Sequence, residues 1–403
     1  MDSVHFFAVL LLLLGTSLFA TERPSPGRTP RLSAWQRILP VTETDISRQN
    51  YLGDEACGAC HSVRVHSYFQ TAHHRTSSFP SSSSIAGSFA NGKNILKTSN
   101  PALYFRMESK PEGFYQSSVW EISSVSSTRS ERMDAVIGSG RKGQTYLYWR
   151  GSALFELPVS YWVDLGSWVN SPGYRDGIAD FDRPVIPRCL ECHATFAETV
   201  AGPPPPNQYK PASLVLGISC ERCHGPGRAH REAMATTRPV GKIVNPAKLP
   251  RDRQIDICAQ CHAGHGRPKS PAFSYVPGEP LSEYLELDQA DPGRGLDVHG
   301  NQVGLLQASR CFQSSTEMSC STCHDVHTTE REAAGYSSRC LKCHRPENCG
   351  EFSKLGEKIE GNCIDCHMPV EPSKLIISDS NAKQTRATVR NHWIKVYPET
   401  GTP

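Results

Sequence analysis

The sequence predicts a fold of mainly short α-helices and coil, interrupted by one β-rich insert, and three observations lead to this prediction. Sixteen cysteines occur almost entirely in closely spaced pairs, and these pairs are unevenly distributed along the 403 residues. Only 38% of the residues are hydrophobic, while glycine (31) and proline (30) are abundant and favour irregular backbone. The long interval between His61 and Cys189 carries short aromatic segments of alternating polarity.

Seven cysteine pairs have the form Cys-x-x-Cys, and each is followed at once by histidine. Two thiols at this spacing form thioethers to both vinyl groups of one porphyrin, and the next imidazole reaches the iron as proximal ligand. Each motif therefore predicts one covalently bound c-type haem. In chain order, motifs 1 to 7 are Cys57-Gly-Ala-Cys60-His61, Cys189-Leu-Glu-Cys192-His193, Cys220-Glu-Arg-Cys223-His224, Cys258-Ala-Gln-Cys261-His262, Cys320-Ser-Thr-Cys323-His324, Cys340-Leu-Lys-Cys343-His344 and Cys363-Ile-Asp-Cys366-His367.

Cysteine pairs of this spacing also occur in zinc sites and in redox-active disulfides. Neither alternative requires a histidine directly after every pair. Histidine occurs about once in twenty-five residues, so seven coincidences in seven pairs are negligible by chance. Seven haems also explain the composition, because about 55 residues per haem are too few to build a separate apolar core around each one. The porphyrins themselves are therefore expected to form much of the core.

The N-terminus predicts export from the cytoplasm. Residues Phe6 to Ala20 form an apolar run that is short for a membrane span and suitable for the central region of a signal peptide. The preceding MDSVH contains no lysine or arginine, which departs from the usual signal. Residues 1–20 are assigned as a signal peptide, with an uncleaved membrane anchor as the alternative. A periplasmic or extracellular bacterial location agrees with c-type haem, which is attached outside the cytoplasm.

The charge balance does not indicate a nucleic-acid partner. The formal charge is +3, and removal of residues 1–20 with Asp2 gives +4. Each ferric haem adds about −1 through its two propionates and the iron–porphyrin core, which brings the oxidised holoprotein to roughly −3. Redox proteins that donate or accept electrons are the expected partners.

The 127 positions between His61 and Cys189 predict a different kind of structure from the rest of the chain. We assign residues 21–79 to an N-terminal segment with motif 1, 80–181 to the β-rich insert and 182–403 to a six-haem region. In the insert, Gln144 to Trp149 and Ala153 to Leu157 flank a Gly-Ser turn and predict a hairpin. The sequence from Gly138 to Gly143 matches G-x-G-x-x-G, but a strand follows where a dinucleotide site needs a helix, so a turn is preferred. The tail after Val370 is polar and carries no motif.

The sixth coordination position decides whether a haem only transfers electrons or also binds a small molecule. Beyond the seven motif histidines and His5, eight histidines remain: His66, His73, His74, His230, His265, His299, His327 and His392. Eight candidates for seven irons predict mostly bis-histidine haems.

Position favours some of these candidates. His230 and His327 follow a proximal histidine too closely to reach the far face of their own haem, but they are well placed for a neighbouring iron. His73 and His74 are adjacent and point in different directions, so one of them is expected to ligate. His265 and His392 come next, and the support is weakest for His66 and His299. Outside the motifs, a disulfide between Cys311 and Cys349 and two unrelated thiols are equal alternatives.

Several segments resemble multihaem cytochromes of the cytochrome c-552/4 family. The similarity lies in Cys220 to His230, Met318 to His327, Asn362 to Pro369 and Tyr68 to His73, and it extends over roughly residues 50 to 395. The resemblance implies a multihaem cytochrome c fold, with short helices and coil organised around stacked haems, and histidines donated between neighbouring sites. It makes His73, His230, His327 and His392 the preferred distal ligands.

These observations favour a secreted heptahaem cytochrome that carries electrons. The alternative is an oxidoreductase that acts on a small nitrogen or sulfur compound at one five-coordinate haem; its catalytic residues are unknown. No motif ends in lysine, as the catalytic motif of one multihaem nitrite reductase family does. Membrane association is expected only if residues 1–20 are retained, and an oligomer or filament is left open.

Overall fold

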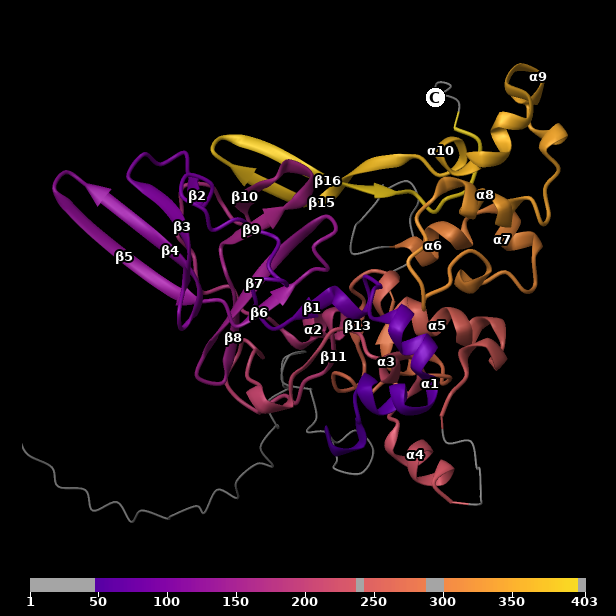
Figure 1. Cartoon of the computed structure of the whole chain (residues 1–403), viewed down its shortest axis with the longest axis horizontal. Coiled ribbons are helices and arrows are strands. Elements are labelled where there is room, and N and C mark those ends of the chain that lie inside the picture. Colours follow the sequence, from indigo (N-terminus) through magenta and orange to yellow (C-terminus); the bar gives the residue numbers. More distant parts are fainter. Residues whose placement is uncertain (1–47, 237–242, 288–300, 398–403) are drawn as a thin grey trace, which may run out of the picture.

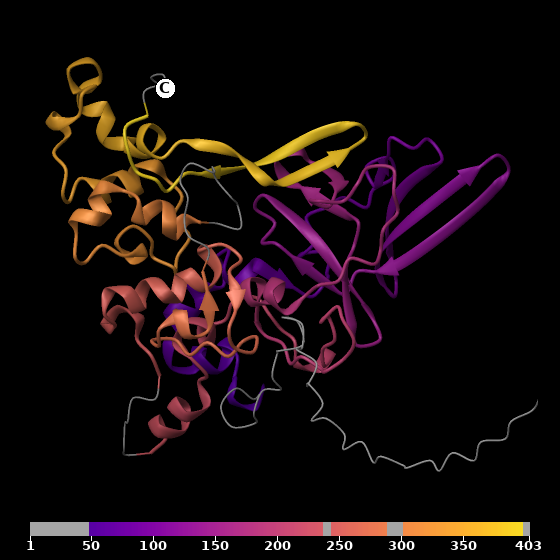
Figure 2. The same cartoon turned by 180° about the vertical axis from the view of Figure 1, so that it is seen from behind.

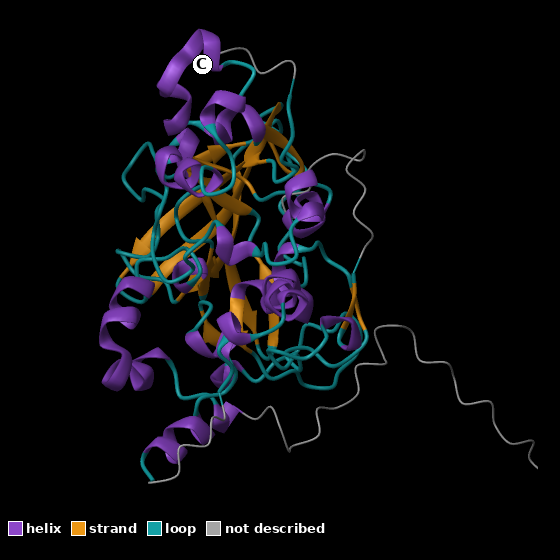
Figure 3. Ribbon diagram, turned by 90° about the vertical axis from the view of Figure 1, so that its right-hand side faces the viewer, coloured by secondary structure: helices purple, strands orange, loops and turns teal. Residues whose placement is uncertain are grey.

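The computed structural model describes residues 48–236, 243–287 and 301–397. The proposed signal peptide, most of the segment before motif 1, and His299 lie outside the described residues. The described chain forms a β-rich part and a helical part that lie side by side, as two opposite views show (Figures 1 and 2). In the helical part, short helices are separated by long loops (Figure 3). No helix of the described ranges is long and apolar enough to span a membrane.

The β-rich part contains two antiparallel sheets. One is a four-stranded meander, in the order β2 (Ile95–Lys97), β3 (Leu103–Lys110), β4 (Gly113–Ile122) and β5 (Val125–Arg132). The other has the order β1-β6-β7-β9-β10, with β8 paired to β7. Its strands are β1 (Ser77–Ser78), β6 (Ala135–Ile137), β7 (Gly143–Arg150), β8 (Ala153–Glu156), β9 (Val159–Trp162) and β10 (Ser167–Asn170).

The strand pattern of the insert follows from the alternation in the sequence. On β3, Leu103, Phe105 and Met107 are buried, and the residues between them are more exposed. Phe105 and Met107 share a core with aromatic side chains of the second sheet, including Tyr146 and Trp168. The predicted hairpin is present as β7–β8, with Arg150 opposite Ala153. The turn from Gly138 leads into β7, a strand and not a helix.

The helical part consists of short helices joined by loops and small two-stranded ladders. The helices are α1 (Asp54–Tyr68), α2 (Pro187–His193), α3 (Cys220–His224), α4 (Arg228–Met234), α5 (Arg251–His262), α6 (Gln302–Gln307), α7 (Arg310–Ser314), α8 (Ala333–Cys340), α9 (Phe352–Leu355) and α10 (Cys363–His367). The ladders pair β11 (Ala194–Phe196) with β12 (Val215–Leu216), and β13 (Arg267–Pro268) with β14 (Leu285–Glu286).

A C-terminal hairpin connects the two parts. The sequence predicted only a polar tail after Val370 and did not predict this hairpin. Strands β15 (Val370–Ser380) and β16 (Lys383–Arg390) form a long ribbon that runs from α10 towards β10 (Figure 1). At its tip, Asn381 and Ala382 have positive φ values of 50° and 57°, as a two-residue hairpin turn requires. The ribbon docks on the insert, where the Asn170 side chain donates to the Asp379 carbonyl at 2.6 Å.

Candidate haem-binding sites

Most motifs lie on helices that end at the motif histidine. This is the case for α2, α3, α5 and α10, and α1 is kinked at His61, where φ is −113° and ψ is 36°. In a helix, residues three apart lie on the same face, so both thiols of a pair point to one side. Motif 5 forms a 3-10 turn over Cys320–Thr322, and motif 6 begins at the last residue of α8.

Three proximal histidines each face a second histidine from a distant part of the chain. The ring centroids are 6.2 Å apart for His224 and His327, 6.2 Å for His324 and His392, and 6.1 Å for His73 and His262. A metal–imidazole bond is about 2.0 Å long and the ring centroid lies about 1.1 Å further out, so two imidazoles on one iron have centroids about 6 Å apart. The residues of motifs 3, 4 and 5 therefore fit a haem iron between two imidazoles.

Hydrogen bonds set the tautomer of several of these imidazoles. The Nδ1 atom of His224 lies 2.8 Å from the Val244 carbonyl, and that of His392 lies 3.1 Å from the Arg390 carbonyl. In motif 7, His367 Nδ1 is 2.9 Å from the Lys395 carbonyl. A carbonyl can only accept, so Nδ1 carries the proton and Nε2 keeps the lone pair that binds a metal.

Desolvation by the surrounding protein keeps the facing imidazoles neutral, although His73, His262 and His324 remain exposed at the surface. Desolvation, with smaller contributions from nearby histidines, lowers the pKa of His73 and of His392 to about 4. Desolvation also lowers the pKa of His224, His262 and His324. The neutral imidazole is the form that coordinates iron, so this environment suits a ligand.

The other candidate distal histidines have different environments. His74 Nδ1 lies 3.1 Å from Asp54 Oδ2, and its ring stacks on Phe69 with centroids 4.4 Å apart. Of the adjacent pair, His73 is therefore the residue that faces a motif histidine. On α4, His230 Nδ1 is buried and has no hydrogen-bond partner, which marks it as a side chain able to contact a further group. His66 is exposed on α1, and the exposed His265 contributes its carbonyl to Arg188 Nε at 2.6 Å.

Thiols of different motifs lie in contact with one another. Cys57 of motif 1 hydrogen-bonds Cys220 of motif 3, although 127 residues lie between His61 and the start of motif 2. Cys192 of motif 2 contacts Cys261 of motif 4, and Cys258 of motif 4 contacts Cys320 of motif 5. Figure 1 shows α1 beside α3, in agreement with the contact between Cys57 and Cys220. Motif 1 therefore lies next to motif 3 in space, although the β-rich insert separates the two motifs in the sequence.

Motifs 5 to 7 extend the same set towards the C-terminus. Cys340 of motif 6 interacts electrostatically with Cys323 of motif 5 and Cys363 of motif 7. The Cys363 backbone N–H donates to Ser337 Oγ of α8 at 2.9 Å. All sixteen cysteines are free thiols in the structure, so Cys311 and Cys349 are not paired. The seven motifs thus form one connected group.

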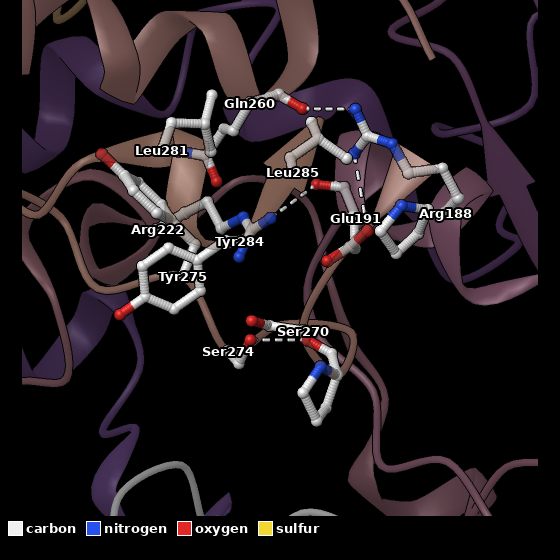
Figure 4. A pocket seen from close by; sticks show the side chains of 12 residues that line it. Arg188, Glu191, Arg222, Gln260, Ser270, Ser274, Tyr275, Leu281, Tyr284 and Leu285 are labelled. Atoms are coloured by element: carbon white, nitrogen blue, oxygen red, sulfur yellow. Dashed lines mark hydrogen bonds and ion pairs between the residues drawn. The ribbon is translucent and has the colours of Figure 1, made fainter. Parts of the chain in front are cut away.

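Residues inside motifs 2, 3 and 4 bind each other directly (Figure 4). Arg222 of motif 3 donates to the Glu191 carbonyl of motif 2 at 3.0 Å. Arg188, just before motif 2, donates to the Gln260 carbonyl of motif 4 at 2.7 Å and pairs with the Glu191 carboxylate at 3.5 Å. These side chains border a small cavity of about 20 Å³. Neither arginine was predicted from the sequence, because the sequence around a motif does not show whether an arginine there is buried.

Comparisons with known proteins agree with this geometry. Residues 176–225, which contain motifs 2 and 3, match the family described as cytochrome c554 and c-prime. The structure is similar to the crystal structure of the outer cell wall cytochrome OcwA, with a TM-score of 0.53 and 16% identity over 86% of this chain and 80% of that chain. No curated protein matches the sequence. The chain therefore has the fold of a multihaem c-type cytochrome. The family match confirms the resemblance to cytochromes of the c554 type over these two motifs.

Proposed function

We propose that the chain is a secreted heptahaem c-type cytochrome that transfers single electrons along a series of mostly bis-histidine haems. The cysteines of the seven motifs would hold the porphyrins, and each following histidine would bind iron. Bound haem supplies a one-electron ferric/ferrous couple. The chain supplies the ligands, the spacing between sites and the shielding from solvent.

The observation that carries this proposal is the set of three facing imidazole pairs. Each joins a motif histidine to a histidine far away in sequence, and the ring separations of 6.1–6.2 Å suit a six-coordinate iron. Two axial imidazoles leave no open position for a substrate, which favours electron transfer over catalysis at motifs 3, 4 and 5. His230 is proposed as a further distal ligand because it follows motif 3 at a distance that lets it reach a neighbouring iron, and its buried Nδ1 has no hydrogen bond that would fix the ring in another position.

The connected arrangement of motifs supports a relay. His327 follows motif 5 but faces the proximal histidine of motif 3, and His73 follows motif 1 but faces that of motif 4. Each such histidine fixes two neighbouring sites relative to one another. Electrons would then pass between adjacent haems, with other redox proteins as donor and acceptor.

Export is proposed from two independent indications. The apolar run from Phe6 to Ala20 suits a signal peptide. The fold is similar to that of a protein described as an outer cell wall cytochrome. A periplasmic or extracellular site of action agrees with both.

An enzymatic role at one haem is the second candidate. The observation that favours it is that the exposed proximal histidines of motifs 1 and 6, His61 and His344, belong to none of the three facing imidazole pairs. A haem held there would be open to a small molecule if its sixth position were free. The substrate class would be a small nitrogen or sulfur compound.

The spin state of the ferric holoprotein separates the two functions. Seven low-spin haems without a spectral change on adding nitrite, sulfite or hydroxylamine are expected for a carrier. A stoichiometric high-spin haem that binds one of these molecules would establish the second candidate instead. Intact mass tests the common premise, because the mature chain must carry seven covalent haem additions.

A further inference from the structure

A largely buried carboxylate of the β-rich part lies close to motif 2. Glu156 is the last residue of β8, and its side chain is only 18% exposed. Its neighbours Phe155 and Leu157 belong to the core, and Leu147 lies opposite it on β7. Nothing in the seven motifs requires a carboxylate at this position.

The charged and titratable groups next to Glu156 come from the segment between β10 and α2 and from motif 2. Arg183 Nε lies 3.3 Å from Glu156 Oε2, and the Arg183 carbonyl accepts from the Glu156 backbone N–H at 3.0 Å. The Tyr174 hydroxyl donates to the Glu156 carbonyl at 2.8 Å. The facing strand contributes the apolar Leu147. Cys189 of motif 2 also interacts electrostatically with the carboxylate, and Asp180 lies near Tyr174 and, like Glu156, raises the pKa of its hydroxyl.

The segment after Arg183 connects β8, which ends at Glu156, to motif 2. The Val185 N–H donates to the Leu154 carbonyl of β8 at 3.0 Å, and the Cys189 N–H donates to the Ile186 carbonyl at 3.0 Å. Burial, and in addition the charge of Glu156, raise the pKa of the Cys189 thiol. Glu156 is therefore electrostatically coupled to the residue that would anchor the second haem.

The carboxylate also gains and loses its proton near neutral pH. Burial raises the pKa of Glu156 to about 7, against the opposing effect of the Arg183 guanidinium. A carboxylate with an ordinary pKa would remain ionised at pH 7 and could not respond to a nearby charge.

We propose that Glu156 couples proton uptake to reduction of the haem held by motif 2. One electron arrives from the neighbouring motif 4 site, whose Cys261 contacts Cys192, and one proton enters the Glu156 carboxylate from solvent. The net charge of the site then stays constant. This inference rests on the proposed electron-transfer function, and it gives the β-rich part a role in that function.

Linkage between proton binding and haem reduction fixes the direction in which the potential changes with pH. Reduction removes one positive charge from the site, so the carboxylate binds its proton more tightly in the reduced state. The potential of this haem then falls as pH rises between the two pKa values of Glu156, with a slope of at most about 59 mV per tenfold change in proton concentration.

Spectroelectrochemical titration of the holoprotein from about pH 5 to about 9 tests the proposal, with an electrode as the one-electron donor. The variants are Glu156→Gln, Arg183→Gln and, as a matched charge control, Glu112→Gln, an exposed residue of the β3–β4 turn. A His193→Met variant identifies the component that belongs to motif 2, because methionine ligation raises its potential.

The expected result is a pH-dependent motif 2 component that becomes independent of pH in Glu156→Gln. In Arg183→Gln the potential of the motif 2 haem should show the same slope at higher pH, because the cation no longer favours the ionised carboxylate. Glu112→Gln should behave as wild type. A slope that persists in Glu156→Gln, or a wild-type motif 2 component without pH dependence, would overturn the proposal. If Glu156→Gln does not fold, the shift in Arg183→Gln decides. Failure of the electron-transfer function would look different, since the haems would then be missing or not reducible.

Discussion

At the scale of single residues, His73 and His74 show how the fold distinguishes two neighbouring imidazoles. His73 faces His262, whereas His74 is held by Asp54. We expect His73→Ala to leave the motif 4 haem with one protein ligand and to produce one high-spin ferric haem. Electron paramagnetic resonance and the visible spectrum measure this change.

His74→Ala is the matched control for this prediction. It removes an imidazole of the same size one residue away, together with the contact to Asp54. The number of low-spin haems should stay as in wild type. A high-spin haem in His74→Ala and none in His73→Ala would reverse the assignment of the two side chains.

Arg188 joins α2 to α5 and to the loop that follows α5. Its guanidinium donates to the carbonyls of His265 and Gln260 and pairs with Glu191, and its side chain is only 7% exposed. Arg188→Met should lower the free energy of unfolding by about 3 kcal/mol, because buried acceptors lose their donor. Denaturant unfolding followed by haem absorbance measures it. The exposed pair Arg267–Glu286 is the control, and Arg267→Met should change stability by less than about 0.5 kcal/mol.

At the scale of elements, the β15–β16 hairpin has a strained tip. Ala382 has φ of 57°, a value that costs an ordinary side chain about 1–2 kcal/mol. Ala382→Gly should therefore stabilise the protein slightly, by up to about 1 kcal/mol. The same substitution at Ala387, inside β16, should destabilise it, because glycine weakens a strand. Equal effects at both positions in thermal unfolding would contradict this reasoning.

The sequence predicts elements whose signal is local. Alternating residues such as Leu103, Phe105 and Met107 identify strands of the insert, and the motif spacing identifies short helices. The C-terminal hairpin was missed because its strands are polar and its turn lacks glycine. The docking of this ribbon on β10 is a contact between segments about 200 residues apart, for which no local pattern exists.

The candidate site divides in the same way. The motifs identify the haem-binding thiols and the proximal histidines directly. The histidines outside the motifs are the candidates for distal ligands. Which motif each candidate faces depends on tertiary packing: His73 meets His262, and His392 meets His324. Glu156 was not recognisable in the sequence, because its chemistry depends on burial rather than on a motif.

At the scale of the whole molecule, the contacts between motifs define an order. Motif 4 contacts motif 2 through Cys261 and Cys192, motif 5 through Cys258 and Cys320, and motif 1 through His73. Motif 7 adjoins the others through motif 6. Motif 4 is therefore a junction, and motif 7 is an end of the series.

This difference predicts how loss of one haem affects the others. A Cys258→Ser/Cys261→Ser variant removes the covalent anchor at the junction, so the motif 2 haem should lose its direct route to motifs 1 and 5 and exchange electrons only through motif 3, which adjoins it through Arg222 and Glu191. Reduction of the holoprotein by a protein donor in a stopped-flow experiment should then develop a slow phase of about one haem. Cys363→Ser/Cys366→Ser is the matched control, because it removes an anchor at the end of the series and should reduce the amplitude without a slow phase. A slow phase in both variants, or in neither, would show that electrons do not follow the contacts between motifs.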